Sequence, residues 1–356
     1  MNFDRVEKIA EAVLYEGYML YPYRPSSVKN QQRWNFGVLA PRSSSEHAPG
    51  FDPWSMQTEC LVRAGDAARI TVKVRFLQII QRTIGRLRTP GQELPEGVEP
   101  QFDPIDRLEL AGRIFQAWQE AVERDYTSAA MSLDFLAAQP QAVLAFPGGR
   151  EFEYLRDEQG RAIGVAVRSW ETLQGSIEFD ACPLHAGSTA DPLFKVTVRV
   201  LNVTPCAVGA DANREAVLPF SLVAAHTLLG IEEGEFISLL EPPPGLDAHA
   251  AACHNVGTWP VLAGDGATTM LSSPIILYDH PQVADESAGN LFDATEIDEI
   301  LSLRILTLTD DEKREMRQSD QRAREILERT ETMPPEQFMK LHGILRGLNP
   351  RAEEAP

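Results

Sequence analysis

Several features that would identify a class of protein are missing from this sequence. No run of eighteen or more apolar residues occurs, so no segment is long enough to cross a bilayer as a helix. The first eight residues alternate in charge, whereas a signal peptide needs a basic patch followed by an apolar stretch. We therefore expect a cytoplasmic protein that is not associated with a membrane.

Cysteine is scarce and scattered. The chain of 356 residues has four cysteines, Cys60, Cys182, Cys206 and Cys253, and no two of them are close together. A small secreted scaffold clusters its cysteines, and a zinc ribbon repeats C-x-x-C, but this chain does neither. In a reducing cytoplasm we expect four free thiols that pack as small hydrophobic side chains.

The glycine-rich motifs of nucleotide-binding and hydrolytic enzymes are also missing. No glycine-rich loop joins a predicted strand to a predicted helix, which argues against Rossmann and P-loop folds. Ser273, Asp279 and His280 have the residue types of a Ser-His-Asp site, but no G-x-S-x-G turn accompanies them. The sequence therefore supports no organic cofactor and names no reaction.

Charge is abundant and unevenly distributed along the chain, whose net charge is −19. Residues 1–90 carry 13 Lys and Arg against 8 Asp and Glu, whereas residues 91–356 carry 20 against 44. Such an asymmetry indicates either a site for an anionic partner or a basic region neutralised by the acidic remainder of the chain. A pI near 4.8 argues against nucleic-acid binding.

The apolar pattern predicts an α+β fold with an antiparallel β-rich core. Residues 69–76 and 193–203 both alternate between apolar and polar side chains, which is typical of half-buried strands. Residues 151–155 and 162–170 are predicted to form a hairpin, and residues 175–182 a further strand. Strands at such short spacing predict a sandwich or a partly closed barrel.

Three other segments are harder to assign. Residues 56–62 are predicted to pair with residues 69–76 through a turn at 63–67. Residues 108–122 fit a helix, but β structure is an alternative towards Val122 and beyond. Residues 219–229 are predicted to be helical, because Pro219 suits a first helical turn and the apolar residues share one stripe. On that helix we expect His226 to be a core residue bonded to a carbonyl group.

Helices are predicted near both ends of the chain. Residues 6–16 form the first, and the last region includes residues 295–303, a charged helix from Thr309 to Arg329 and a short one from Pro334. Pro and Gly concentrate in residues 91–106, which predicts a linker. The expected organisation is a basic helix and strand region (1–90), the linker (91–106), a β-rich domain ending in a helix (107–240), and a mixed and helical region (245–356).

Aromatic and basic residues in the first quarter are candidates for contact with a protein partner. Residues 15–36 are interrupted by proline and combine tyrosines with Trp34 and arginines, the residue types that dominate binding hot spots. The alternative is that these aromatics are buried against the first helix and the basic strand. The candidates are Tyr21, Tyr23, Arg24, Arg33 and Trp34, together with Arg69, Lys73 and Arg75 on one strand face.

Residues 253–281 combine several side chains that can perform chemistry. Cys253, His254, Asp279 and His280 are the residue types of a metal- or thiol-dependent site. A metal set could also include Cys60 and the pair Cys182 and His185, which has the spacing C-x-x-H. The other interpretation is structural, with two strands joined by a turn at 264–266 and docked on the core. The sequence leaves the choice open.

Five phrases of the sequence resemble a family of uncharacterised bacterial proteins. They are LYEGYMLYPYR (14–24), QQRWNFG (31–37), MQTECLV (56–62), NVGTWPV (255–261) and MLSSPIILYD (270–279). The family is associated with gene clusters of NiFe-hydrogenases, especially the actinobacterial-type uptake enzymes. The resemblance implies a non-enzymatic accessory protein that binds a hydrogenase subunit or maturation factor during assembly of the metalloenzyme. The resemblance implies no catalytic residues in this sequence.

Overall fold

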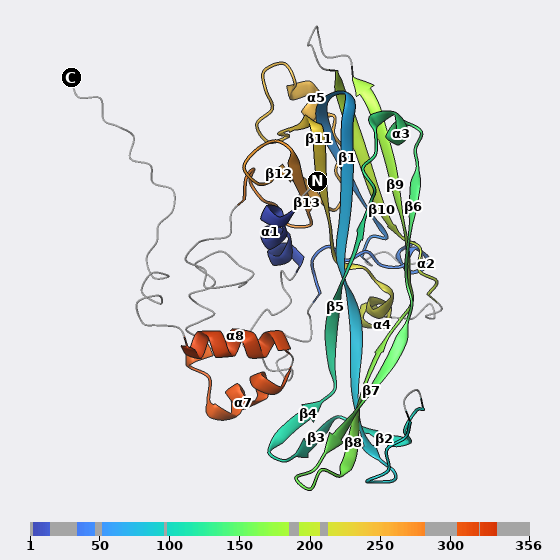
Figure 1. Ribbon diagram of the computed structural model, residues 1–356, viewed down its shortest axis with the longest axis vertical. Helices are drawn as coiled ribbons and strands as arrows, with labels where there is room; N and C mark the ends of the chain where they lie inside the picture. Colours follow the sequence, from blue (N-terminus) through green and yellow to red (C-terminus); the bar gives the residue numbers. More distant parts are fainter. Residues whose placement is uncertain are drawn as a thin grey trace, which may run out of the picture.

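The sheet of this protein is large, antiparallel and not closed, and its core is sandwich-like. The computed structural model describes residues 3–14, 34–46, 52–95, 98–184, 192–206, 213–281, 305–319 and 321–332. Within these residues, eleven strands form one sheet with the central order β12-β13-β11-β1-β10-β9-β6, and two more strands form a separate hairpin. Figure 1 shows the strands running along the longest axis of the molecule.

The elements are labelled as in Figure 1. The strands are β1 (Ser55–Leu87), β2 (Phe102–Ile105), β3 (Arg107–Leu110), β4 (Arg113–Gln116), β5 (Trp118–Thr127), β6 (Gln141–Phe146), β7 (Gly149–Arg156), β8 (Ala162–Trp170), β9 (Leu173–Leu184), β10 (Leu193–Asn202), β11 (Val223–Ile237), β12 (Trp259–Leu262) and β13 (Thr269–Ser273). The helices are α1 (Asp4–Leu14), α2 (Arg42–Ser45), α3 (Leu133–Ala137), α4 (Arg214–Val217), the 3-10 helix η2 (Leu218–Phe220), α5 (Asp247–Ala251), α7 (Asp310–Ser319) and α8 (Gln321–Thr332).

β1 organises the fold because it belongs to both layers of the sandwich. Its first part pairs with β10 and, at residues 61–64, with β11, and its later part pairs with β11, β5, β8 and β2. The register against β11 shifts between Ala64 and Arg69, where Figure 1 shows β1 turning over at the top of the molecule. As a result, Cys60 and Val62 pack in the same core cluster as Val72 from the later part.

The expected hairpin within β1 is correct in the position of its turn and wrong in its pairing. Residues 55–63 pair with β10, and β11 pairs with residues 61–64 and again with residues 69–77. The two parts of β1 therefore do not pair with each other, and they meet across the core through their side chains. β11 bends with β1, and Gly234 lies at its bend. A Cβ atom on Gly234 would lie 2.8 Å from the Cβ atom of Ala64, so the close approach of the two bends requires glycine.

The strands predicted by alternation are confirmed. In β1, Ile70, Val72, Val74 and Phe76 are completely buried, and they line the core together with Val196, Val198 and Val200 of β10. β7 and β8 pair as the expected hairpin, with Phe152 opposite Val167. A side-chain period of two is a local property of the sequence, so it predicts which face of a strand is buried.

The predicted helix at 219–229 is wrong. Only Leu218–Phe220 is helical, and the chain then enters β11. β11 lies between β1 and β13 and is covered on both faces, since Leu229 packs in the central core and Leu228 packs under α1. A strand buried on both faces has no alternating pattern, which is why its apolar run also fits a helix.

Residues 107–127 form the strands β3, β4 and β5, which settles the ambiguity in favour of β structure. The predicted linker contains β2, whose residues Phe102–Ile105 pair with Ile84–Leu87 of β1. The sheet takes strands from 55–87, 102–105, 118–237 and 259–273. The expected boundaries near residues 90, 106 and 240 therefore fall between strands of one sheet.

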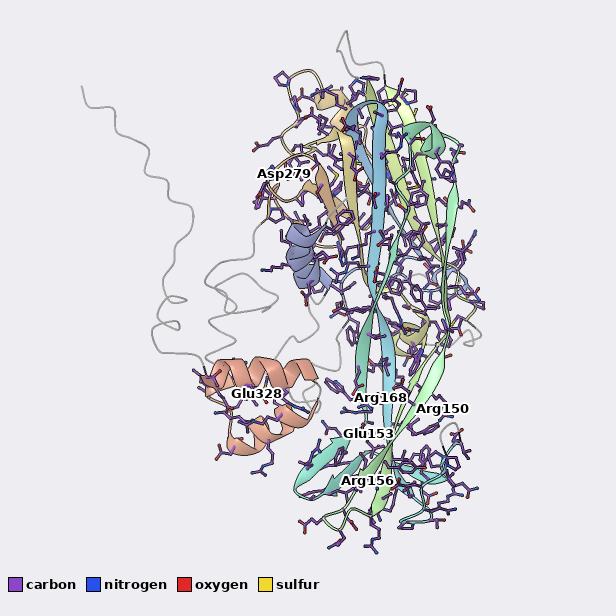
Figure 2. The ribbon with its side chains drawn as sticks, viewed as in Figure 1. Arg150, Glu153, Arg156, Arg168, Asp279 and Glu328 are labelled. Atoms are coloured by element: carbon purple, nitrogen blue, oxygen red, sulfur yellow. The ribbon has the colours of Figure 1, made fainter. Side chains whose placement is uncertain are left out.

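Ion pairs connect the strands at the lower end of the molecule. Arg168 of β8 contacts Glu120 of β5 at 2.8 Å and Glu153 of β7 at 2.9 Å. Arg156 pairs with Glu93. Figure 2 shows Arg150, Glu153, Arg156 and Arg168 gathered along β7 and β8. The charges of these neighbouring strands therefore compensate one another.

The described helices lie outside the sheet. α1 covers one face of it, where Val6, Ala10 and Val13 pack against Leu228 and Leu271. In front of α7, the expected capping box forms, because the Thr309 amide donates to Glu312 at 2.6 Å and the Glu312 amide donates to the Thr309 hydroxyl. The helices predicted at 295–303 and from Pro334 lie outside the described residues.

Candidate functional site

The segment that follows α5 is fastened to β1 through Glu59. One carboxylate oxygen of Glu59 accepts a hydrogen bond from the His254 amide at 2.7 Å. The other contacts the Lys195 ammonium group at 3.0 Å and the Thr197 hydroxyl at 3.4 Å. The Glu59 amide in turn donates to the Asn255 side-chain oxygen at 2.7 Å. Glu59 and Asn255 therefore lock two distant parts of the chain together.

The environment of Glu59 keeps its carboxyl group ionised. Burial acts to raise the pKa of Glu59, but the hydrogen bonds from the His254 amide, Lys195 and Thr197 outweigh it, and the pKa lies below the ordinary value of 4.5. A buried carboxylate with three donors is stable as an anion and is poorly suited to accept a proton. Its geometry is that of a structural contact.

A cluster of buried hydroxyl groups joins the same segments. The Thr58 hydroxyl donates to Ser272 at 2.7 Å, and the hydroxyl groups of Thr258 and Ser272 are 2.8 Å apart. Next to them, Gln57 and Val256 form an isolated β-bridge. The phrases 56–62, 255–261 and 270–279, whose contacting residues are up to 214 positions apart in sequence, thus meet at one place in the fold.

The phrase 31–37 reaches the same region through Gly37. This glycine has a φ of +55°, and a Cβ atom there would lie 2.8 Å from the side chain of Pro274. Its carbonyl group accepts a hydrogen bond from the Ala225 amide at 2.9 Å. The described parts of four of the five phrases therefore lie around the β12–β13 hairpin and its neighbours.

The thiols in this region are not activated. Burial raises the pKa of the Cys253 thiol to about 11, with a further increase from the Glu59 carboxylate that Lys195 partly opposes. Burial raises the pKa of Cys60 far above its ordinary value. Cys253 donates its S–H to the His249 carbonyl group at 3.6 Å. Because the thiolate is the nucleophile, thiols this basic are poor candidates for nucleophilic catalysis at neutral pH.

Asp279, His280 and Ser273 each have a separate contact. Asp279 accepts hydrogen bonds from the Leu262 amide at 2.7 Å and from the Ser238 hydroxyl. His280 lies 2.8 Å from the Gly264 carbonyl oxygen through Nδ1, and the Ser273 hydroxyl accepts from the Ile275 amide. None of these contacts joins the three side chains to one another, and each one instead holds the segment after β13 in place.

The candidate metal ligands are divided between two faces of the sheet. Cys60 points into the central core, whereas Cys253 packs beside Leu61 on the opposite face. Cys182 is exposed and lies opposite Lys195 in the β9–β10 ladder. Among the residues that the structure describes, no group of three His, Cys, Asp or Glu side chains is arranged to hold a metal ion. His185 lies outside the described residues.

The basic strand face is largely occupied by contacts within the chain. Lys73 pairs with Glu7 of α1 at 2.7 Å, and Arg75 pairs with Glu123 of β5 at 3.3 Å. Arg69 donates to the backbone carbonyl groups of residues 66–68. Alternation correctly places all three on one face, but two of these cations already have carboxylate partners.

His226 is a buried residue of this same face, opposite Arg75 in the β1–β11 ladder. Its Nδ1 atom donates to the Ala224 carbonyl oxygen at 2.9 Å, as expected for a core histidine. Burial lowers the pKa of His226 to about 3, and Arg75 and Lys73 add to the decrease. The imidazole is therefore neutral at pH 7, and its Nε2 atom has no hydrogen-bond partner within the described part of the chain.

Trp34 is a packing residue at the start of the described part of the aromatic stretch. Its side chain is buried in a cluster with Leu14, Leu77 and Val223, and its indole N–H donates to Gln119 at 3.0 Å. The other aromatic and basic candidates of this stretch, Tyr21, Tyr23, Arg24 and Arg33, lie outside the described residues.

Large apolar side chains are exposed on the β12–β13 hairpin and the segment after it. We call Trp259, Ile276 and Tyr278 the apolar surface; their side chains are 44%, 76% and 87% exposed. Ile275 and Leu277 alternate with them and pack inwards against the cluster under α1. Asp279, which anchors this segment, is labelled at the side of the β12–β13 hairpin in Figure 2.

Sequence reasoning singled out residues 253–281 and the phrase 56–62, which contains Glu59, but it did not predict the contact of Glu59 with Lys195 or the apolar surface. No local signal pointed to the apolar surface, because residues 275–278 are four consecutive apolar side chains and a short apolar run predicts a buried segment rather than one with an exposed face. No local signal connected Glu59 to His254, because the contact spans 195 residues.

The fold and these contacts define a β-rich, sandwich-like protein with an irregular segment fastened along one edge. None of the helices in the described ranges is both long and apolar enough to span a membrane. A scan of known protein families finds none that matches the chain, and a search of curated proteins finds no match.

Proposed function

We propose that this chain is a non-enzymatic accessory protein that binds a protein partner in the cytoplasm and assists the assembly of a metalloenzyme. The observation that carries the proposal is the exposure of Ile276 and Tyr278 on a segment that is otherwise fixed. Tyrosine and large apolar side chains on a rigid support are the residue types that form binding hot spots.

The support of this segment favours binding without a large cost in conformational entropy. Asp279 ties it to the Leu262 amide, the His280 amide donates to the Leu262 carbonyl oxygen at 2.7 Å, and Leu277 packs inwards. Side chains that are already positioned lose less freedom on association than those of a mobile loop. Both of these hydrogen bonds are made to Leu262 of β12, the strand at the end of the strand order.

The resemblance to the hydrogenase-associated family supplies the identity of the partner in this proposal. We infer that the partner is a hydrogenase subunit or a maturation factor. A metal-bearing state of either one would be bound through protein contacts. The exposed apolar surface supports a protein partner of this kind.

A pull-down from the native host tests the proposal. The tagged chain and a variant with Ile276→Ser and Tyr278→Ser are expressed at equal levels, and the bound proteins are quantified by mass spectrometry. Hydrogenase subunits or maturation factors are expected to be enriched with the wild-type chain and reduced at least about tenfold with the variant. If neither class is enriched with the wild-type chain, the proposal is wrong.

A further inference from the structure

We propose that the apolar surface binds a polypeptide segment that combines apolar anchor residues with flanking Lys and Arg. The inference rests on the proposed function, since it describes the kind of partner segment that the accessory protein would bind. It is carried by two independent observations, the exposure of the apolar surface and the sign of the charge around it.

The exposed side chains of the apolar surface lie on β12 and on the segment that follows β13. Ile276 and Tyr278 are two residues apart in an extended segment, so they point to the same side. Trp259 is two residues before Val261, and Val261 packs in the same cluster as Ile275 and Leu277. Trp259 therefore lies on the face of β12 that this segment covers.

The sequence around the apolar surface contains no basic side chain other than histidine. From Glu215 to Leu303 there is no Lys or Arg, although the chain has 33 of them. The part of this stretch from 215 to 281 carries eight carboxylates: Glu215, Glu232, Glu233, Glu235, Glu241, Asp247, Asp265 and Asp279. Glu235 is paired with Arg63, and the stretch still has an excess of negative charge, which would attract a cationic partner to the apolar surface and repel an anionic one.

Two of these carboxylates lie beside the Tyr278 end of the apolar surface. The amide of Glu241 donates to the Ser238 hydroxyl at 2.8 Å, and this hydroxyl also contacts Asp279, the residue after Tyr278. Asp265 follows Gly264, whose carbonyl oxygen contacts His280. Glu241 and Asp265 thus border the end of the segment where a basic residue of the partner would lie.

The arrangement predicts how the complex forms. Tyr278 and Ile276 would be covered by apolar side chains of the partner, and Lys or Arg next to them would face Glu241 and Asp265. Apolar contact at the centre supplies affinity, and complementary charge at the rim speeds association and selects the partner. The charged part of the interaction weakens as the salt concentration rises.

Site-specific photo-cross-linking in the native host tests this inference. p-Benzoylphenylalanine replaces Tyr278 in one strain and Val143 in a control strain. Val143 is also strongly exposed, at 77%, but lies on β6 at the other end of the strand order. We expect the probe at position 278 to capture a peptide with apolar residues and an excess of Lys and Arg. The probe at position 143 should not capture this peptide.

A captured peptide without an excess of Lys and Arg, or the same peptide from both positions, overturns the inference. So does the absence of any adduct at position 278 when the tagged wild-type chain recovers its partner. In these cases the proposed function stands, and only the surface or its specificity is wrong. If the wild-type pull-down itself recovers no hydrogenase subunit or maturation factor, the proposed function fails first.

Binding of the recovered partner to the purified chain gives a second measurement. The double variant Glu241→Gln with Asp265→Asn is expected to weaken binding several-fold at low salt and to reduce the dependence of Kd on salt. Glu158→Gln, an exposed change in the β7–β8 turn, is the matched control and should leave both unchanged. Equal salt dependence in all three proteins contradicts the inference.

Discussion

The carboxylate of Glu59 accepts a hydrogen bond of 2.7 Å from the backbone amide of His254, 195 residues further along the chain. The contact explains why a segment rich in chemically capable side chains adopts a fixed conformation. Glu59 also receives Lys195, so its charge is compensated within the sheet. A second hydrogen bond joins the same two segments, because the side-chain oxygen of Asn255 accepts from the Glu59 amide.

Replacement of Glu59 by Gln is expected to lower the free energy of unfolding by about 2 kcal/mol, because a charge-assisted bond is lost and Lys195 is left without its anion. Glu178→Gln on the same sheet face is the control and should change it by less than about 0.5 kcal/mol. Urea unfolding at pH 7 measures both. Equal midpoints for the two variants would show that Glu59 is not a clamp.

Glu59→Gln should also change how the free energy of unfolding depends on pH. The pKa of folded Glu59 lies below the ordinary value of 4.5, so its contribution is present above that pH and is lost as the pH falls through the lower folded pKa. The difference in unfolding free energy between wild type and Glu59→Gln should therefore shrink below pH 4.5. A difference that stays constant between pH 7 and pH 3 would contradict the assignment.

His226 should make the protein less stable in mild acid. The pKa of His226 is lowered from 6.5 to about 3, so the unfolded chain takes up a proton below pH 6.5 that the folded chain does not. Between pH 7.5 and pH 5.5, we expect the wild type to lose about 1 kcal/mol through this group, and His226→Asn to lack that loss. Exposed His254→Asn is the control and should behave like the wild type.

The cysteines should differ in their reaction with iodoacetamide at pH 7. Exposed Cys182 is expected to react first, Cys253 much more slowly because its pKa is about 11, and buried Cys60 only on unfolding. Peptide mass spectrometry over a time course gives the three rates. Rapid modification of Cys253 would revive the thiol-dependent alternative, as would loss of partner binding in a folded Cys253→Ser variant.

Gly234 should be intolerant of any side chain. Its added Cβ would lie 2.8 Å from Ala64 and 2.7 Å from Ile231, where β1 and β11 bend together. We expect Gly234→Ala to lower the unfolding free energy by about 1–3 kcal/mol. Gly266→Ala is the matched control, because no atom lies within 4 Å of its added Cβ. Similar melting temperatures for the two variants would argue against the close approach of the bends.

In the segment after β13, substitution of Leu277 should lower the stability, whereas substitution of the neighbouring Ile276 should weaken the binding of the partner. Leu277→Ala is expected to cost about 1–2 kcal/mol, since Leu277 packs under α1. Ile276→Ala should change the stability by less than about 0.5 kcal/mol while weakening the binding of the partner. Thermal unfolding and a binding assay on both variants separate the two roles. A large loss of stability from Ile276→Ala would remove it from the apolar surface.

Local patterns in the sequence predicted two kinds of element. These are strands that pair with a strand close to them in sequence, and strands or helices that have one apolar and one polar face. The alternation of residues 69–76 and 193–203 identified strands together with their buried side chains, and residues 151–170 were correctly predicted as a hairpin. The helix α1 and the capping box at Thr309 were also predictable, because spacing and capping depend on a few consecutive residues.

Tertiary structure alone decided the elements and contacts that depend on distant residues. Residues 223–229 are a strand because β1 and β13 lie on either side of them, and their own spacing does not distinguish a buried strand from a helix. The two parts of β1 do not pair with each other because β10 and β11, which are distant in sequence, provide their partners. Likewise, burial raises the pKa of the Cys253 thiol, Asp279 is bonded to the Leu262 amide and the Ser238 hydroxyl, and the exposure of Tyr278 depends on Leu277 packing inwards. A hydrogen bond or buried face requires two surfaces to meet, and a stretch of sequence specifies only one of them.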